Sequence, residues 1–191
     1  MDIHSNRTDL VQKLNRNAVE ILEFNKIQGL LTSYSSCEMG FELIRALRPS
    51  YSTSTVKIRQ RQTQEAREYL ETGGRFDASG IQDIRSVVQR AMHGGQLTGL
   101  DLRSVCETLH NIRVECSAIL NKGRTGGWLV KSTKQIPDLL ELENILSLSI
   151  SVNGEITDDA SLDLQKTRAE RAKAHSEVIT SVNKIIRSIQ N

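Results

Sequence analysis

Residues 153–191 read NGEITDDASLDLQKTRAERAKAHSEVITSVNKIIRSIQN, and this stretch decides the fold of the chain. It opens on a polar turn in which Gly154 is free to take a positive φ. Asp158, Asp159 and Ser161 then offer side-chain oxygens that can cap a helix start. No Gly or Pro follows Gly154. The pattern therefore predicts one long helix that reaches the end of the chain.

The predicted helix carries a seven-residue repeat. Its repeat positions alternate at spacings of four and three, a period typical of a helix that winds around a partner helix. They are Leu164, Arg168, Arg171, His175, Val178, Val182, Ile185 and Ile189. Such a helix of about thirty residues would run roughly 45 Å, which is too long for a domain of this size to wrap. We expect one arm of a coiled-coil projection whose returning segment lies beyond Asn191.

Composition favours helices over sheets and indicates a reducing compartment. Two Pro and 4% aromatic residues among 191 argue against a β-sandwich or barrel. The formal net charge of +2 is close to neutral and does not by itself indicate a nucleic-acid partner. An odd number of Cys, three, fits a reducing environment. The sequence shows no apolar signal segment and no run long enough to span a membrane, so we expect a cytoplasmic protein.

The rest of the chain also predicts helices. Periodicity and capping residues place them at about 8–18, 25–34, 35–48, 52–71, 81–93, 99–119 and 136–150, with Pro137 in the first turn of the last. The face from Leu102 to Ile119 has the clearest repeat, and we expect it to be buried. Gly40 lies within a helix at a cost of about 1 kcal/mol, so we expect another backbone to approach it closely. Residues 121–135 are expected to form a loop, and the fold class is all-α.

One segment of that loop resembles a phosphate-binding loop. Gly123-Arg124-Thr125-Gly126-Gly127 has the glycines but lacks the Gly-Lys-Ser/Thr ending, and no parallel-sheet strand precedes it. We therefore interpret it as a flexible linker. Cations in and beside it could contact an anionic partner, although a solvated loop uses the same residue types. They are Lys122, Arg124, Lys131 and Lys134.

Two further features resemble sites but favour structural interpretations. Cys106 and His110 lie four residues apart on one predicted helix, which could place two ligands on a metal. No second pair has ligand spacing, so we expect a buried thiol beside a surface His. Asp158 and Asp159 precede a helix start, where carboxylates act as caps and dipole partners. No catalytic triad can be assembled from the spacing of nucleophiles and bases, so we predict no catalytic residue and no metal site.

The long C-terminal helix is basic. Its cations outnumber Asp163, Glu170 and Glu177, and they are candidates for contacts with a nucleic-acid backbone. The candidate residues are Lys166, Arg168, Arg171, Lys173, Lys184 and Arg187. A solvated helix surface of mixed charge explains the same residues equally well.

Three blocks of residues resemble a known family in their order and approximate spacing. The first block is Leu22-Glu23-Phe24-Asn25-Lys26-Ile27 with Gly40 and Pro49. The second is Gly80-Ile81 with Asp83-Ile84-Arg85, Arg90-Ala91, Gly94-Gly95 and Leu97. The third is Gly154-Glu155-Ile156 with Asp158, Ala160-Ser161, Leu164 and Arg168. Together they resemble the N-terminal part of MutS-two, the bacterial MutS paralogue that lacks the mismatch-reading domains.

The resemblance implies a domain plan. We expect a loose N-terminal segment with room for a short helix over residues 1–17, and a helical core and lever bundle over 18–152. The start of a clamp arm would follow over 153–191, where the long C-terminal helix would form a coiled coil with a returning helix.

The resemblance also implies a function. Full-length members are ABC-type ATPases that use ATP and Mg²⁺ and usually carry an Smr nuclease domain. They are associated with restraining recombination through branched DNA and with rescuing collided ribosomes. This chain contains neither Walker motifs nor an Smr domain. The resemblance therefore implies a non-catalytic portion without a cofactor of its own, with branched DNA or the ribosome and its RNA as partner, in a homodimer.

The alternative is a protein-interaction module. In that case the arm is only a dimerising coiled coil, without contact to nucleic acid. The two hypotheses differ in salt dependence, because phosphate contacts weaken steeply as salt rises and an apolar helix pair does not.

Overall fold

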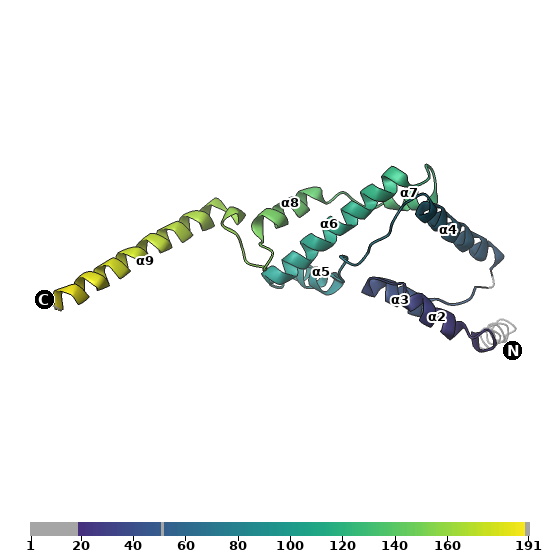
Figure 1. The fold of residues 1–191 in the computed structure, drawn as a ribbon, viewed down its shortest axis with the longest axis horizontal. Coiled ribbons are helices and arrows are strands. Elements are labelled where there is room, and N and C mark those ends of the chain that lie inside the picture. The colour runs from purple at the N-terminus through teal and green to yellow at the C-terminus, as the bar shows by residue number, and fades with distance from the viewer. Residues whose placement is uncertain (1–18, 51, 190–191) are drawn as a thin grey trace. The chain divides into compact units, whose positions relative to one another are not determined.

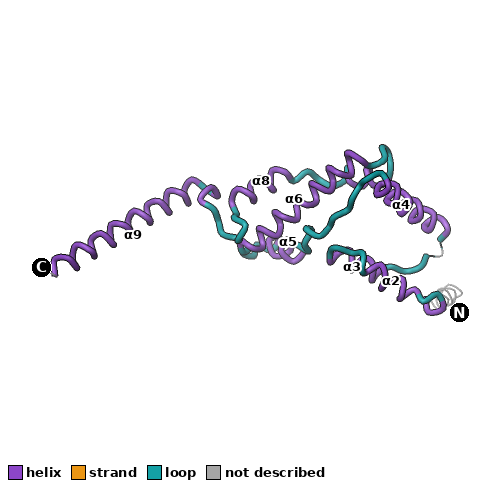
Figure 2. The backbone as a smooth tube through the Cα atoms, viewed as in Figure 1, coloured by secondary structure: helices purple, strands orange, loops and turns teal. Residues whose placement is uncertain are grey.

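The computed structural model describes residues 19–50 and 52–189, and the regular structure within them is helical (Figures 1 and 2). The helices are α2 Phe24–Thr32, α3 Glu38–Ala46, α4 Thr53–Glu71, α5 Arg85–Met92, α6 Gly99–Lys122, α7 Trp128–Thr133, α8 Leu140–Ser149, the 3₁₀-helix η1 Asp158–Ala160 and α9 Leu162–Ile189. An isolated antiparallel bridge joins Ile150 and Ile156, and the described residues contain no strand. The all-α prediction is confirmed. No described helix is both long and apolar enough to cross a bilayer.

The chain divides into two compact units. One consists of Met1–Asp83 with Asn111–Asp138, and the other of Ile84–His110 with Leu139–Asn191. Helix α6 contributes residues to both. The predicted core and lever domain over 18–152 and arm over 153–191 stay predictions. The predicted loose segment 1–17 and the helix over 8–18 lie outside the described residues.

In the first unit, α4 has a defined start and a defined end. The N–H of Thr55 donates to the Ser52 Oγ at 3.3 Å, which caps the first turn. Gly73 follows the last turn with φ 82°, the left-handed conformation that glycine adopts freely. Tyr69 is only 3% exposed and packs its ring against Phe76, with the ring centroids 4.9 Å apart. The helix predicted over 52–71 is confirmed.

Helix α7 was not expected from the sequence. The prediction of a loop over 121–135 is wrong, because residues 128–133 are helical and pack against α4 within the first unit. Leu129, Val130 and Thr133 are buried, so α7 fixes this segment to the unit.

The second unit has its small apolar core between α6 and α8. Cys106, Leu146 and Ile150 are buried together. Three half-buried residues pack around them, namely Leu102, Val105 and Leu109. The predicted face from Leu102 to Ile119 is thus half-buried rather than buried. The buried residues of α6 are Cys106 and Thr108, which lie beside that face.

Helix α6 begins with a reciprocal cap. The Thr98 N–H donates to Asp101 Oδ2 at 2.9 Å, and the Asp101 N–H donates to Thr98 Oγ1 at 3.1 Å. The Asp101 carboxylate also accepts from Arg90 at 3.0 Å. Hydrogen bonds from the backbone and hydroxyl of Thr98, with the charge of Arg90, lower the pKa of Asp101 below its usual value.

Two glycines bring two backbone segments of the second unit into contact. A Cβ added to Gly99 would collide with the carbonyl oxygen of Gly154. Gly154 has φ 77° in the turn before η1, and a Cβ there would lie 2.7 Å from the Leu100 side chain. The turn predicted at Asn153-Gly154 therefore packs directly on the start of α6.

Two smaller predictions are wrong. A Cβ on Gly40 would meet the side chains of Ser35 and Cys37, so no second backbone approaches it. Helix α8 begins at Leu140, so Pro137 lies before the helix and not in its first turn. Leu139 has φ −117° and ψ 24°, which is not a helical conformation, so the helix begins after it and later than the capping pattern predicted.

We expect Gly99→Ala to destabilise the protein by about 2 kcal/mol or more, because the new methyl group would separate α6 from the Gly154 turn. Gly29→Ala is the matched control. Gly29 lies within α2, no atom lies within 4 Å of the position that a Cβ would take there, and the change should raise stability by about 0.5–1 kcal/mol. Urea unfolding of both variants measures the two changes. Equal stability of Gly99→Ala and the parent would contradict the close approach.

We expect Leu109→Asp to destabilise the second unit by about 3 kcal/mol, since it would place an unpaired carboxylate against Cys106, Leu146 and Ile150. Leu148→Asp is the control on α8, where the leucine is 64% exposed. Thermal unfolding should show a large fall in Tm for the first variant and little change for the second. An unchanged Tm for Leu109→Asp would mean that the core lies elsewhere.

Candidate nucleic-acid interface

Helix α9, which carries the six candidate cations, starts from a capped turn. The Leu164 N–H donates to Ser161 Oγ at 3.1 Å, so Ser161 caps the helix. Asp158 lies in η1 and forms an ion pair with Arg168 in the second turn of α9. Of the three predicted cap residues, Ser161 is confirmed, whereas Asp158 and Asp159 lie in η1 and do not cap α9. Asp158 instead joins η1 to α9.

The six candidate cations differ in their surroundings. The exposed ones are Lys166, Arg171, Lys173 and Lys184. Arg168 is half-buried, and its charge is partly engaged by Asp158. Arg187 lies on α9, but its side chain is outside the described part of the chain. Four of the six side chains are thus exposed and able to contact an anionic partner.

The helix brings three of the lysines to one side. A helix turns about 100° per residue, and Lys173 and Lys184 follow Lys166 by seven and eighteen residues, about two and five whole turns. We call Lys166, Lys173 and Lys184 the lysine side; it spans about 27 Å at a rise of 1.5 Å per residue. Arg168 and Arg171 are rotated by about 140–200° from it, so the structure separates them from the lysines.

Acidic residues share the lysine side. Glu170 and Glu177 lie within about 40° of Lys166 around the helix axis. The lysine side is therefore of mixed charge, with the lysines in slight excess. Both explanations of the sequence pattern remain compatible with this surface.

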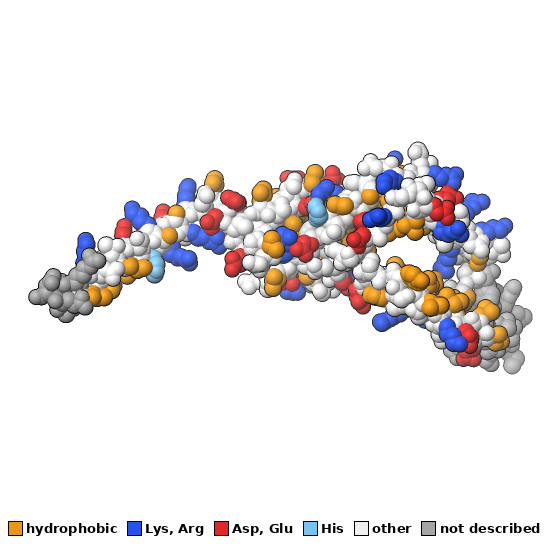
Figure 3. Space-filling model, in the orientation of Figure 1, with side chains coloured by type: hydrophobic (Ala, Val, Ile, Leu, Met, Phe, Trp, Pro, Cys, Tyr) orange, Lys and Arg blue, Asp and Glu red, His pale blue; other side chains and the backbone are white. Residues whose placement is uncertain are grey.

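An apolar stripe occupies the opposite side of α9 toward its C-terminal end. Its residues are 48–59% exposed, namely Val178, Ile179, Val182, Ile185 and Ile186. Figure 3 shows apolar side chains along one edge of this part of α9 and basic side chains along the other edge. The stripe continues toward the start of the helix through Arg168, Arg171 and His175, as the seven-residue repeat predicts.

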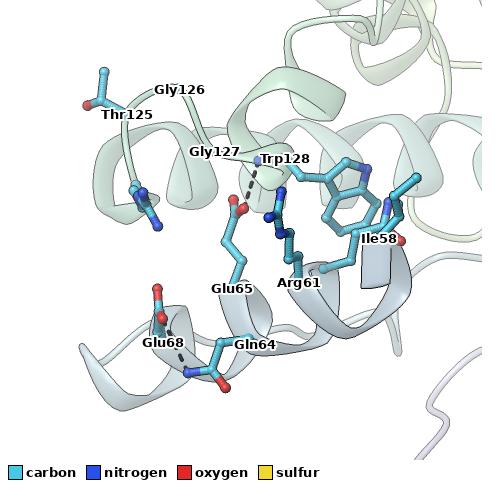
Figure 4. Close-up of a pocket in the computed structure, with 11 residues that line it drawn as sticks. Ile58, Arg61, Gln64, Glu65, Glu68, Thr125, Gly126, Gly127 and Trp128 are labelled. Carbon is cyan, nitrogen blue, oxygen red and sulfur yellow. Dashed lines mark hydrogen bonds between the residues drawn. The ribbon is translucent and has the colours of Figure 1, made fainter. Parts of the chain in front are cut away.

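The two backbone N–H groups that follow the Gly123–Gly127 segment are not available to a phosphate. A Glu65 carboxylate oxygen from α4 accepts from the backbone N–H of Trp128 at 2.8 Å (Figure 4). Its other oxygen accepts from the backbone N–H of Leu129 at 2.9 Å. These N–H groups are the ones that would bind an anion at the start of a helix. The carboxylate from the same chain occupies that position, and the segment leads into α7 instead of acting as a flexible linker.

The Cys106 and His110 pair contains a buried thiol, as expected. Cys106 donates through its Sγ to the Glu143 carbonyl oxygen at 3.8 Å, and burial raises the pKa of the thiol. His110 is exposed, but its Nδ1 lies 2.8 Å from Oε1 of Glu143, whose side chain is buried. The pair thus belongs to the packing of α6 on α8. Among the described residues no group of three potential ligands could hold a metal.

Sequence reasoning passed over one basic surface. Residues 43–64 contain no acidic residue, although acids and bases are almost balanced over the whole chain. The cations of this segment are Arg45, Arg48, Lys57, Arg59 and Arg61. Counting charge in windows would have found it. What the sequence could not show is that Arg61 lies beside Trp128, whereas Arg59 donates to the Arg48 carbonyl oxygen at 3.5 Å.

No family model matches the chain. It is similar to proteins named endonuclease MutS2. The one from Geobacillus thermodenitrificans is 31% identical over 178 residues, which are 92% of this chain and 23% of that protein. The one from Halothermothrix orenii is 29% identical over 182 residues, 91% of this chain and 23% of that protein. The one from Thermomicrobium roseum is 30% identical over 171 residues, 88% of this chain and 22% of that protein.

The chain therefore spans less than a quarter of the length of these relatives. Over about nine tenths of its own length, it is similar to one part of the endonuclease MutS2 proteins.

Proposed function

We propose that this chain is a non-catalytic portion of a MutS2-like DNA-binding ATPase, and that α9 makes its principal contact with nucleic acid. The observation that carries the proposal is the similarity to endonuclease MutS2 along nine tenths of the chain, together with the exposed lysine side of α9. The target is branched DNA, the ribosome or both, and the action is to restrain recombination or to act on collided ribosomes.

The lysine side suits a phosphate backbone better than a base edge. Lysine ammonium groups act as point charges without the bidentate geometry that reads bases. Lys166 and Lys173 are about 10 Å apart along the helix axis, and Lys184 is about 17 Å further. The side chains can reach separate phosphates, which positions the helix on a duplex without sequence preference.

Mixed charge sets the strength of this contact. Glu170 and Glu177 repel the same phosphates that attract the lysines, so we expect modest affinity and a steep loss of binding as salt rises. An arm that encloses a polymer benefits from weak, sequence-independent contacts, because it can then slide along the polymer.

The chemistry of the proposed parent protein lies outside this chain. ATP and Mg²⁺ would bind the ATPase part, and the chain would transmit its nucleotide state to the arm. We assign no catalytic residue to the chain and no cofactor of its own.

Exposure of the apolar stripe favours a second function, helix pairing. An exposed apolar row of this size is unusual on a monomeric surface. In a homodimer, a parallel pair would set Arg168 and Arg171 against their own copies. An antiparallel pair avoids that repulsion. The stripe and the lysine side lie on opposite sides of α9, so pairing and phosphate contact are compatible.

A variant of the lysine side tests the nucleic-acid contact. We expect Lys166→Gln, Lys173→Gln and Lys184→Gln together to weaken binding to a four-way DNA junction and to lower the salt slope of log K by about 2–3, since each phosphate contact contributes about 0.9. Glu170→Gln with Glu177→Gln should tighten binding, because it removes repulsion from the same side. Fluorescence anisotropy over a salt series measures both. Identical slopes for the parent and the lysine variant would exclude this contact.

A second pair of variants tests helix pairing. We expect the parent to associate at tens of micromolar and Val182→Lys with Ile185→Lys to be monomeric, because two charges would interrupt the stripe. Ser176→Lys with Thr180→Lys adds the same charge away from the stripe and should associate like the parent. Sedimentation equilibrium gives the masses. A monomeric parent with the same mass as the stripe variant would rule out pairing between copies.

A further inference from the structure

A groove of about 560 Å³ lies in the first unit between α4 and the segment that leads into α7 (Figure 4). Two apolar side chains in it remain open to solvent: Trp128 is 45% exposed and Ile58 is 57% exposed. Two arginines, Arg61 from α4 and Arg124 from the glycine segment, also line it. The groove thus combines an aromatic surface with two guanidinium groups.

The backbone at Trp128 is anchored, while the ring is exposed. Glu65 accepts from the backbone N–H of Trp128 and from the backbone N–H of Leu129. Leu129 and Val130 are buried, which anchors α7 directly after the tryptophan. In Figure 4 the indole ring lies beside the Arg61 and Ile58 side chains. An exposed indole on an anchored backbone loses little conformational entropy when a planar group stacks on it, because a Trp side chain has only two torsions to restrict.

The arginines of the groove are not engaged by its carboxylates. Glu65 accepts from the two backbone N–H groups of α7, and Glu68 accepts from Gln64 Nε2 at 3.2 Å. Within the described part of the chain, the side chains of Arg61 and Arg124 form no hydrogen bond or ion pair. Residues 53–64 of α4 contain no acidic residue. The positive charge beside Trp128 is therefore free to attract an anion.

We propose that this groove binds an unpaired segment of single-stranded nucleic acid, with one base stacked on Trp128 and the adjacent phosphates on Arg61 and Arg124. Stacking on an aromatic side chain needs a base whose face is exposed, which a continuous duplex does not offer. No atom lies within 4 Å of the position that a Cβ would take on Gly126, so a nucleotide backbone can approach the segment at that residue. An acidic peptide would use the arginines but would leave the indole surface unused.

This inference rests on the proposed function, since it assumes that the protein engages nucleic acid, and it specifies which feature is recognised. Unpaired nucleotides occur where strands separate, as at branch points, and in the loops of structured RNA. The groove would bind the unpaired nucleotides, whereas the lysine side of α9 would contact phosphates of any strand.

The single tryptophan of the chain makes the test direct. Titration of the full chain with an oligothymidylate of about ten nucleotides should quench the fluorescence of Trp128 to saturation. Arg61→Gln and Arg124→Gln should each weaken the affinity about fivefold or more through a lost phosphate contact. Arg67→Gln is the matched control, since Arg67 lies on α4 outside this groove and pairs with Glu71.

A second readout covers Trp128 itself. Anisotropy of a labelled oligothymidylate should show Trp128→Leu about tenfold weaker than the parent, while Trp128→Phe, which keeps an aromatic ring, should recover part of the loss. Circular dichroism checks that both variants are folded. Equal affinity of the leucine variant and the parent would overturn the stacking contact, as would binding without any change in Trp128 fluorescence.

Competitors and the lysine variant of α9 separate the remaining outcomes. A matched duplex, or a polyglutamate peptide of equal charge, that quenches Trp128 as strongly as the oligothymidylate would overturn the proposal of an unpaired strand. Binding that depends on Lys166, Lys173 and Lys184 but not on Arg61 or Arg124 would leave the proposed function standing and reject the groove. No binding of either DNA by the parent would reject both.

Discussion

The backbone contact between Gly99 and Gly154 is the constraint on which the second unit depends. It brings the start of α6 against the turn before η1, at a distance that no side chain permits. The bridge between Ile150 and Ile156 closes the same turn, and Asp158 then pairs with Arg168 to set the first turns of α9. A short loop is thereby rigid enough to start a 28-residue helix in a defined place. The core beneath it is small, so this contact matters more than it would in a large domain.

Several carboxylates in this protein are engaged by groups of its own chain and not by the exposed cations of α9 or of the Trp128 groove. Glu65 binds the start of α7, Glu143 lies against His110, and Asp158 holds Arg168. Two groups of exposed cations have no such carboxylate partner within the described part of the chain. They are the lysine side of α9 in one unit and the arginines beside Trp128 in the other. Net charge near zero therefore does not exclude local excesses of cations, a slight one on the lysine side of α9 and one of two arginines beside Trp128.

Helix α9 carries two different surfaces on opposite sides of its axis. The seven-residue repeat places aliphatic residues on one side, while the lysines recur on the other at intervals close to whole turns. A helix built this way can pair through one side and contact phosphates through the opposite side.

Local sequence determined most of the helices and their ends. Ser52, Gly73, Gly94 and the Gly-free stretch after Gly154 act within a few residues of the structures they start or stop, so their effect is readable without a fold. The rotation of the lysines around α9 is also contained in the sequence, because helical geometry is regular. Only the tertiary structure decided α7, since its first N–H groups are satisfied by Glu65, which precedes Trp128 by 63 residues. It alone also placed Trp128 beside Arg61 and closed Gly99 on Gly154, because those contacts join residues that no local pattern connects.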